Sequence, residues 1–121
     1  MPFQYVLANL LAKVPGAVAV VFIDDLGETI EVATTGYSPE ELKMFVAYFG
    51  IGLRQARALL EPTQLGAPEL IHLRHKKMNV HAICLPDGYF LVLLQSSPAL
   101  TGLARRHMRS AVADLERELF S

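Results

Sequence analysis

Residues 38–60 constrain this chain more than any other part of the sequence. Ser38 is a preferred N-cap residue, Pro39 suits the first helical position, and Glu41 completes a capping box, so the segment is predicted to form one long helix. At helical spacing, one face carries the apolar stripe of an ordinary core-facing helix. That stripe consists of Leu42, Phe45, Val46, Phe49, Leu53, Ala56 and Leu60.

The same helix has a second apolar face. Its members are Met44, Ala47, Tyr48, Ile51 and Ala58, with Gln55 as the only polar residue among them. The polar strip between the two faces is narrow and consists of Lys43, Arg54 and Arg57. A helix that is apolar over most of its circumference must be buried over most of it. Because a chain of 121 residues has little protein left to cover a second face, we expect another copy of the chain, or a partner protein, to cover it.

Length and composition indicate one domain, residues 1–121, with a modest core. The chain is 52% hydrophobic, and its 11 basic and 12 acidic residues give a net charge of −1, which excludes a general nucleic-acid-binding domain. The single cysteine, Cys84, excludes an internal disulfide framework and favours a reducing compartment. The N-terminal residues lack the features of a secretion signal, and the longest apolar run, Ala17–Ile23, is too short to span a bilayer. We therefore expect a cytoplasmic protein with no membrane insertion.

Hydrophobic periodicity divides the rest of the chain into two more helices and five strands. A helix is predicted over 3–14, and a final helix is predicted to open at Ser97-Pro98 and to bury a stripe that starts at Leu100. The strands are predicted at 17–23, 28–33, 69–74, 78–85 and 89–94. Ile30 and Val32 are expected to point to the same face of the second strand, which alternates and looks half exposed.

Turn signals and apolar runs together predict the sheet. Hairpins make neighbours of the first two strands and of the last three. Strands one and five are continuously apolar and belong at the centre, which gives one antiparallel sheet in the order 2-1-5-4-3. Helices should cover both faces, with the long middle helix on one and the two terminal helices on the other. The predicted fold class is α/β (α+β), a profilin-like sandwich.

In this order and spacing the chain resembles the roadblock/dynein-light-chain family. The resemblance rests on residues 14–17 running into 20–24 and Gly27, on 71–77, and on 80–83 and 89–95, and it covers roughly residues 3–118. It implies a small, non-catalytic homodimer similar to the bacterial MglB-like members. Those members accompany small Ras-like GTPases, bind them and stimulate hydrolysis of GTP by the GTPase. The resemblance also implies pairing through the middle helix and the neighbouring edge strand, which joins two sheets into one.

The second helix face and the uncovered edge strand predict a set of dimer contacts. The set is Met44, Ala47, Tyr48, Ile51, Gln55, Leu70, Ile71, His72, Leu73 and Arg74. The protein partner is expected to contact Lys43, Arg54 and Arg57, which paired helices would leave exposed. Gly52 lies at the border between the helix faces and allows either close approach of helices across a dimer or tight packing on the sheet. Gly50 lies on the polar strip, where an irregularity of the helix is equally plausible.

Two clusters have both a structural and a functional interpretation. His72 and His81 are predicted to lie opposite each other, but a zinc site needs a third ligand, and Cys84 should point to the other face of the sheet. The basic tip at residues 74–77 either contacts phosphate or an acidic partner or is simply a solvated turn, and the solvated turn is favoured.

The remaining charged clusters also favour the structural interpretation. Asp24 and Asp25 suit the chemistry of a hairpin turn better than acid–base catalysis. Arg105, Arg106 and Arg109 have two interpretations, the solvent face of the last helix and a stripe that binds a partner, and the solvent face is favoured.

No phosphate-binding loop, Ser-His-Asp pattern or zinc-binding spacing occurs in the sequence, so neither an enzyme nor a cofactor is expected. The main alternative to an interaction module is a small-ligand sensor of the PAS or GAF type, which has a similar sheet order. A buried cavity of several hundred cubic ångströms between the sheet and the middle helix would favour the sensor. A filled core with a paired helix surface would favour the interaction module.

Overall fold

The computed structural model describes residues 2–66, 69–97 and 99–120. The helices are α1 (Pro2–Lys13), α2 (Pro39–Leu60) and α3 (Thr101–Phe120), with short 3-10 turns η1 (Glu61–Thr63) and η2 (Pro86–Gly88). The strands are β1 (Ala17–Ile23), β2 (Thr29–Thr34), β3 (Leu70–Arg74), β4 (Met78–Cys84) and β5 (Phe90–Ser96). Within the described ranges, no helix is both long and apolar enough to cross a membrane.

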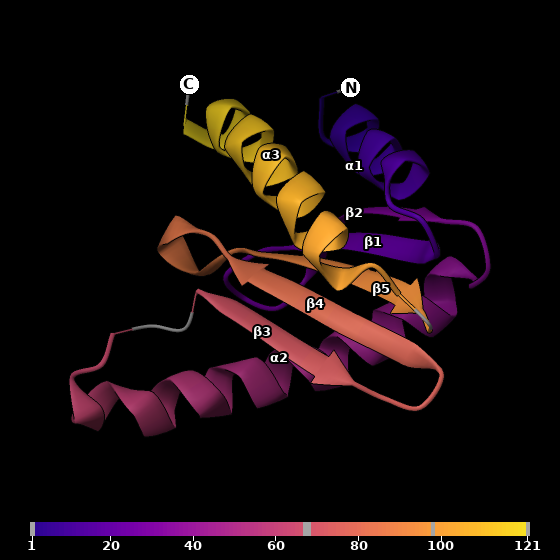
Figure 1. The fold of residues 1–121 in the computed structure, drawn as a ribbon. Helices are drawn as coiled ribbons and strands as arrows, with labels where there is room; N and C mark the ends of the chain where they lie inside the picture. Colours follow the sequence, from indigo (N-terminus) through magenta and orange to yellow (C-terminus); the bar gives the residue numbers. More distant parts are fainter. Residues whose placement is uncertain (1, 67–68, 98, 121) are drawn as a thin grey trace.

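The strands form one antiparallel sheet in the order β2-β1-β5-β4-β3. β1 and β5 lie at the centre because they are apolar on both faces; Val20, Val21 and Leu93 are fully buried. α2 lies on one face of the sheet, and α1 and α3 lie side by side on the other (Figure 1). The predicted fold class, strand order and placement of the three helices are confirmed.

Each face of the sheet has its own apolar core. Leu7 and Leu10 of α1 and Met108 and Leu115 of α3 pack with Phe22 and other residues of the sheet on one side. On the other side, three buried residues of α2 pack against the sheet, and the half-buried Phe45 and Phe49 pack beside them. The buried three are Leu42, Val46 and Leu53, three of the seven residues predicted for the core stripe of the helix. Burial of this apolar surface is the main favourable contribution to folding.

α2 begins as the sequence predicts. The Ser38 side chain accepts a hydrogen bond from the Glu41 backbone N–H at 3.2 Å, and the Glu41 carboxylate accepts one from the Ser38 N–H at 3.4 Å. This reciprocal pair satisfies donors that the start of a helix otherwise leaves unpaired. Farther along the stripe, the half-buried rings of Phe45 and Phe49 stack with their centroids 5.6 Å apart.

The predicted facing of Ile30 and Val32 is wrong. The register between β1 and β2 shifts at the end of β1, where Ile23 pairs with Thr29 and Phe22 pairs with Glu31, so that Ile30 is an extra residue. An extra residue in one strand reverses the alternation of side chains on either side of it. Ile30 therefore packs against the core on the α1 and α3 side, whereas Val32 packs against the core on the α2 side.

The predicted start of the last helix is also wrong. α3 begins at Thr101, and its first bond runs from the Ala104 N–H to the Leu100 carbonyl at 3.1 Å. Ser97 instead extends the sheet: its N–H donates to the Lys77 carbonyl at 3.0 Å, and its hydroxyl accepts from Asn79 Nδ2 at 2.9 Å. Leu100 is 61% exposed and does not belong to the buried stripe. Pro98, the second residue of the predicted cap, lies outside the described residues.

Candidate interaction surface

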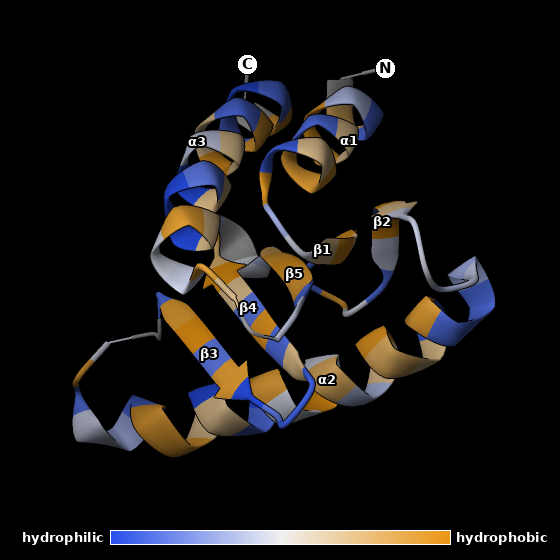
Figure 2. Cartoon of the chain, turned by 45° about the vertical axis from the view of Figure 1, so that its right-hand side comes forward, coloured by the Kyte–Doolittle hydropathy of each residue, from blue (hydrophilic) through white to orange (hydrophobic). Residues whose placement is uncertain are grey.

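The second apolar face of α2 is uncovered. Met44 is 67% exposed, Tyr48 74% and Ile51 54%, and Ala47 and Gln55 are exposed as well. Apolar residues recur along both α2 and β3 (Figure 2). Large apolar side chains gathered on one exposed face of a small protein are typical of an interaction site. All five residues of α2 that the sequence places in a dimer contact thus lie on one exposed helix face.

β3 forms the edge of the sheet on this side of the molecule. Within the described part of the chain it pairs only with β4. Leu73 is 42% exposed and Arg74 is exposed, whereas Leu70, Ile71 and His72 are half-buried. The outer backbone of such a strand offers unpaired N–H and C=O groups, which can recruit a further strand.

Two further exposed apolar residues, one on this helix face and one beyond the end of α2, were not predicted from the sequence. Leu59 is 77% exposed and Leu65 is 79% exposed. In two views the C-terminal part of α2 runs past the edge of the sheet at β3, where the sheet cannot cover it (Figures 1 and 2). The helical spacing from Gln55 to Leu59 was the available signal, because residues four apart lie on the same side of a helix.

The two glycines inside α2 have different environments. Gly52 is exposed, and a Cβ atom at this position would meet nothing within 4 Å, so packing on the chain's own sheet does not explain it. Gly50 is buried, and a Cβ atom there would lie 3.9 Å from the Cα atom of Gly27. Gly50 thus lies on the side of α2 that the turn between β1 and β2 covers, the side from which Arg54 also reaches this turn.

The three basic side chains predicted to contact a partner have different surroundings. Arg54 donates from Nη2 to the backbone carbonyl of Asp25 at 3.3 Å. The Arg57 guanidinium lies over the ring of Phe90, 4.5 Å from its centroid, in a cation–π contact. Lys43 is exposed. Arg57 therefore has a packing role inside the chain, and Lys43 and Arg54 remain accessible on the surface of α2.

Arg57 also lies beside the single cysteine. Burial raises the pKa of the Cys84 thiol, and the positive charge of Arg57 opposes this shift. The thiol is half-buried on the same side of the sheet as the core that α2 covers.

His72 and His81 are cross-strand neighbours, as the sequence predicts. Their rings stack with centroids 4.6 Å apart and planes 14° apart. Arg105 approaches His72 with Nη2 3.0 Å from Nδ1, so this arginine points at the sheet and not at solvent as expected. Arg106 and Arg109 are exposed. A guanidinium against the imidazole opposes binding of a metal cation, and the described residues contain no cluster of three metal-ligating side chains.

The carboxylate of Asp24 is occupied by the turn between β1 and β2. Its Oδ1 accepts hydrogen bonds from the backbone N–H groups of Leu26 and Glu28, both at 2.9 Å. This is the turn chemistry that the sequence favours over acid–base catalysis.

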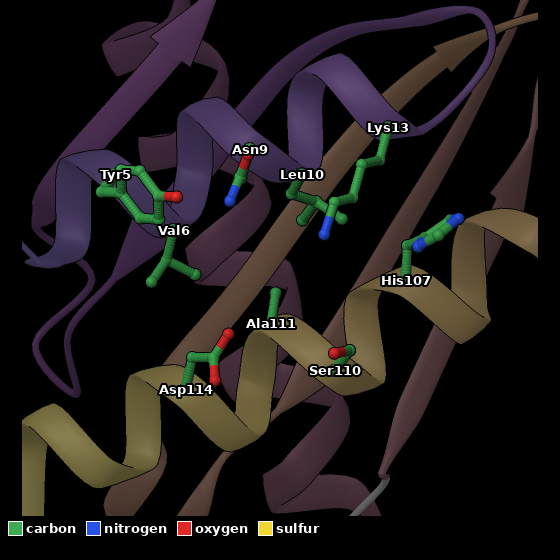
Figure 3. Close-up of a pocket in the computed structure, with 9 residues that line it drawn as sticks. All are labelled: Tyr5, Val6, Asn9, Leu10, Lys13, His107, Ser110, Ala111 and Asp114. Carbon is green, nitrogen blue, oxygen red and sulfur yellow. The ribbon is translucent and has the colours of Figure 1, made fainter.

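One small hollow lies between α1 and α3 (Figure 3). Its volume is about 50 Å³, and Tyr5, Asn9 and Lys13 of α1 face His107 and Asp114 of α3 across it. Ligand pockets usually enclose roughly 300–1,000 Å³, so this hollow is too small for most ligands.

A larger hollow of about 340 Å³ lies at the N-terminal end of α2. Most of its lining is apolar, and the complete lining is Tyr37, Glu41, Leu42, Phe45, His75, Met78, Val80 and Leu94. The hollow lies at one end of the interface between α2 and the sheet. Farther along the helix, apolar side chains such as Val46 and Leu53 fill this interface.

No family model matches the sequence, and no curated protein matches it. Solved structures do match the fold. MglB of Myxococcus xanthus superposes with a TM-score of 0.87 over 97% of this chain and 94% of that chain, at 14% identity. A Roadblock/LC7 domain from Streptomyces avermitilis gives a TM-score of 0.85 over 98% of both chains, at 17% identity. A structure described as MglB with a tetrameric arrangement gives 0.83 over 93% of this chain and 84% of that chain, at 19% identity.

Proposed function

We propose that this chain, which has the roadblock/LC7 fold, is a non-catalytic homodimeric interaction module that binds and regulates a small Ras-like GTPase. Residues 1–121 would act as one domain. The observation that carries the proposal is the uncovered apolar face of α2, with Tyr48 74% and Ile51 54% exposed, next to the open edge of β3. An exposed apolar face of this kind on a small chain is typical of a site that a second protein surface covers, because contact removes the apolar side chains from water.

A second copy of the chain suits both parts of this surface. An isologous contact uses the same patch on both subunits, so α2 would pack against α2 and β3 would pair with β3. Pairing of the edge strands would join two five-stranded sheets into one and would remove two open edges. The similarity in fold to an MglB structure described as tetrameric supports self-association of this kind.

The GTPase partner is proposed on the similarity to MglB in fold together with the family resemblance of the sequence. The chain would act by holding the switch loops of the GTPase in one arrangement, because those loops are the parts whose order changes with the bound nucleotide. Lys43 and Arg54 are the cations on α2 that remain at the surface, and both are exposed. They would contact the GTPase.

The test is binding to the small Ras-like GTPase encoded in the same genome, loaded with GDP or with a non-hydrolysable GTP analogue. We expect calorimetry to give a higher affinity for one nucleotide state and the rate of GTP hydrolysis to change on addition of the chain. Lys43→Glu or Arg54→Glu should weaken binding at least several-fold, because each reverses a charge on the proposed contact. Arg106→Glu, an equal change at an exposed position of α3, should not.

Equal affinity for both nucleotide states would contradict regulation by this chain. No binding in either state would contradict the GTPase partner altogether. Loss of binding in Arg106→Glu to the same extent as in Lys43→Glu would place the contact somewhere other than α2.

The alternative of a small-ligand sensor is favoured by one observation, the hollow of about 340 Å³ at the end of α2. Few polar groups line it, and the Glu41 carboxylate there is already bonded to the Ser38 N–H. If the chain is a sensor, a small molecule should raise its melting temperature in a saturable way, and Leu94→Phe, which fills the hollow, should abolish the effect.

A further inference from the structure

We propose that the stacked pair His72 and His81 is a proton-operated latch between the sheet and the first turns of α3. Uptake of a proton by the pair would release Arg105 from His72 and loosen the N-terminal half of α3. This proposal concerns the folded chain itself and does not depend on dimer formation or on a GTPase.

The hydrogen bonds around His72 suit only its neutral form. Arg105 can only donate, so its Nη2 at 3.0 Å requires an unprotonated Nδ1 on His72. His72 Nε2 lies 2.8 Å from Asn79 Oδ1 and donates to it, because Asn79 uses its Nδ2 to donate to the Ser97 hydroxyl. A proton on Nδ1 would set an N–H group against the N–H groups of Arg105, and the contact would break.

The surroundings of His81 also suit only the neutral form. His81 Nε2 lies 3.0 Å from Gln95 Oε1, and the Gln95 amide is oriented by donating from Nε2 to the Pro15 carbonyl at 2.9 Å. His81 therefore donates from Nε2. Its Nδ1 is buried without a hydrogen-bond partner, and the residue is 0% exposed. A proton on Nδ1 would create a buried N–H group with no acceptor, next to a second positive charge.

The groups that face the pair provide no negative charge to balance a proton. β3 contributes His72 and the neighbouring Arg74, and α3 contributes Arg105. The contributions of the other elements are neutral: the amides of Asn79 and Gln95, the Ser97 hydroxyl and the Pro15 carbonyl. No carboxylate is hydrogen-bonded to this cluster within the described part of the chain. Protonation therefore adds a positive charge to a partly buried cluster that already contains a guanidinium group, which favours opening of the cluster.

The direction of the pH effect follows from the same groups. Burial lowers the pKa of His81 below its ordinary 6.5; the hydrogen bond to Gln95 opposes this shift, and His72 and Arg105 lower the pKa further. The unfolded chain, with an ordinary histidine, binds the proton at higher pH than the folded chain does. The contribution of the neutral cluster to stability is thus complete above about pH 6.5 and is lost as the pH falls toward the lower pKa of folded His81.

The experiment measures urea unfolding and hydrogen exchange at about pH 7.5 and about pH 5.5. For the natural chain, the unfolding equilibrium constant should rise by up to about tenfold per pH unit below pH 6.5 for each proton taken up. Amide protection of residues 101–108 should fall over the same range, while residues 109–119 serve as the internal reference. The double variant His72→Gln with His81→Gln removes both imidazoles and should remove both effects. His75→Gln, which changes an exposed histidine in the same hairpin, should retain them.

Arg105→Met provides a second variant in case the double histidine variant does not fold. It keeps an apolar stem and removes the positive charge, so the pKa of His81 measured by NMR should rise and the pH dependence of unfolding should become smaller. Equal pH dependence in the natural chain and both variants would overturn the latch. Unchanged protection of residues 101–108 at the lower pH would overturn it as well.

Discussion

At the residue scale, three glycines in or beside α2 have different surroundings. Gly27 has a φ of +86°, which the turn between β1 and β2 needs and which side chains disfavour. Gly50 is buried where α2 passes this turn, whereas Gly52 faces open space on the outer side of the helix. The sequence shows three similar residues; their roles depend on what lies opposite each of them.

Gly27→Ala should lower the free energy of unfolding by about 1–2 kcal/mol, because an L side chain is strained at positive φ. The new Cβ atom would also lie 2.9 Å from Arg54 Nη2, so the end of that side chain must move. Gly36→Ala is the matched control, since a Cβ atom there meets nothing within 4 Å and its φ is not positive. Urea denaturation of the two variants checks this, and equal losses of stability would contradict it.

At the element scale, α2 combines a face that the sheet covers with a face that nothing in the described chain covers. Leu42, Val46 and Leu53 are buried, whereas Tyr48 and Leu59 are exposed. The absence of a side chain at Gly52, at the border of the exposed face and about halfway along it, permits close approach of another helix. In the proposed dimer, an antiparallel pair of α2 helices with its two-fold axis at Gly52 would set Leu59 against Phe45 of the partner subunit, beside the hollow at the end of α2.

Gly52→Cys should therefore form a disulfide between subunits under mild oxidation, because residues on a two-fold axis between closely packed helices come within the roughly 4.4–6.8 Å that a disulfide requires between Cα atoms. Non-reducing gel electrophoresis measures the fraction of linked dimer. The natural chain, which retains Cys84, and Gly36→Cys, at an exposed glycine outside α2, should stay largely monomeric on the gel. A dimer in solution that links no better through position 52 than through position 36 would refute this placement of the axis.

At the scale of the whole molecule, the exposed surface is distributed unequally. α1 and α3 cover one face of the sheet together, while α2 alone covers the other and leaves the edge at β3 open (Figure 1). Self-association through α2 and β3 would cover the side of the sheet that α2 covers only in part. The side covered by α1 and α3 would remain accessible. This asymmetry makes α2 and β3, rather than α1 and α3, the favoured contact between copies.

Tyr48→Glu or Ile51→Glu should convert the proposed dimer to monomers, because either change would bury an unpaired charge in the contact. Light scattering coupled to size-exclusion chromatography measures the mass. Tyr5→Glu is a control of the same chemistry, at a tyrosine that is 70% exposed on α1, and should leave the dimer intact. A full-strength dimer in both α2 variants would contradict the contact, and a monomeric natural chain would contradict the dimer itself.

By itself, the sequence determined the elements, the strand order and the face of the sheet that each helix covers. The reason is that these features depend on local signals that survive in any environment: apolar periodicity in α2, continuous apolar runs in β1 and β5, and turn residues between strands. The sequence also predicted the second apolar face of α2, which the structure leaves exposed.

Only the tertiary structure decided where particular side chains lie when a distant partner competes for them. Ser38 caps a helix, whereas Ser97, in the same Ser-Pro setting, is bonded to Asn79 and Lys77 of the neighbouring strand and its turn. Arg57 lies over Phe90, and Arg105 bonds to His72, although both have the spacing of solvent-facing residues on their helices. The physical reason is that hydrogen bonds and cation–π contacts between elements form only after the elements have packed. The local pattern of one segment does not contain the distances between its side chains and those of another element.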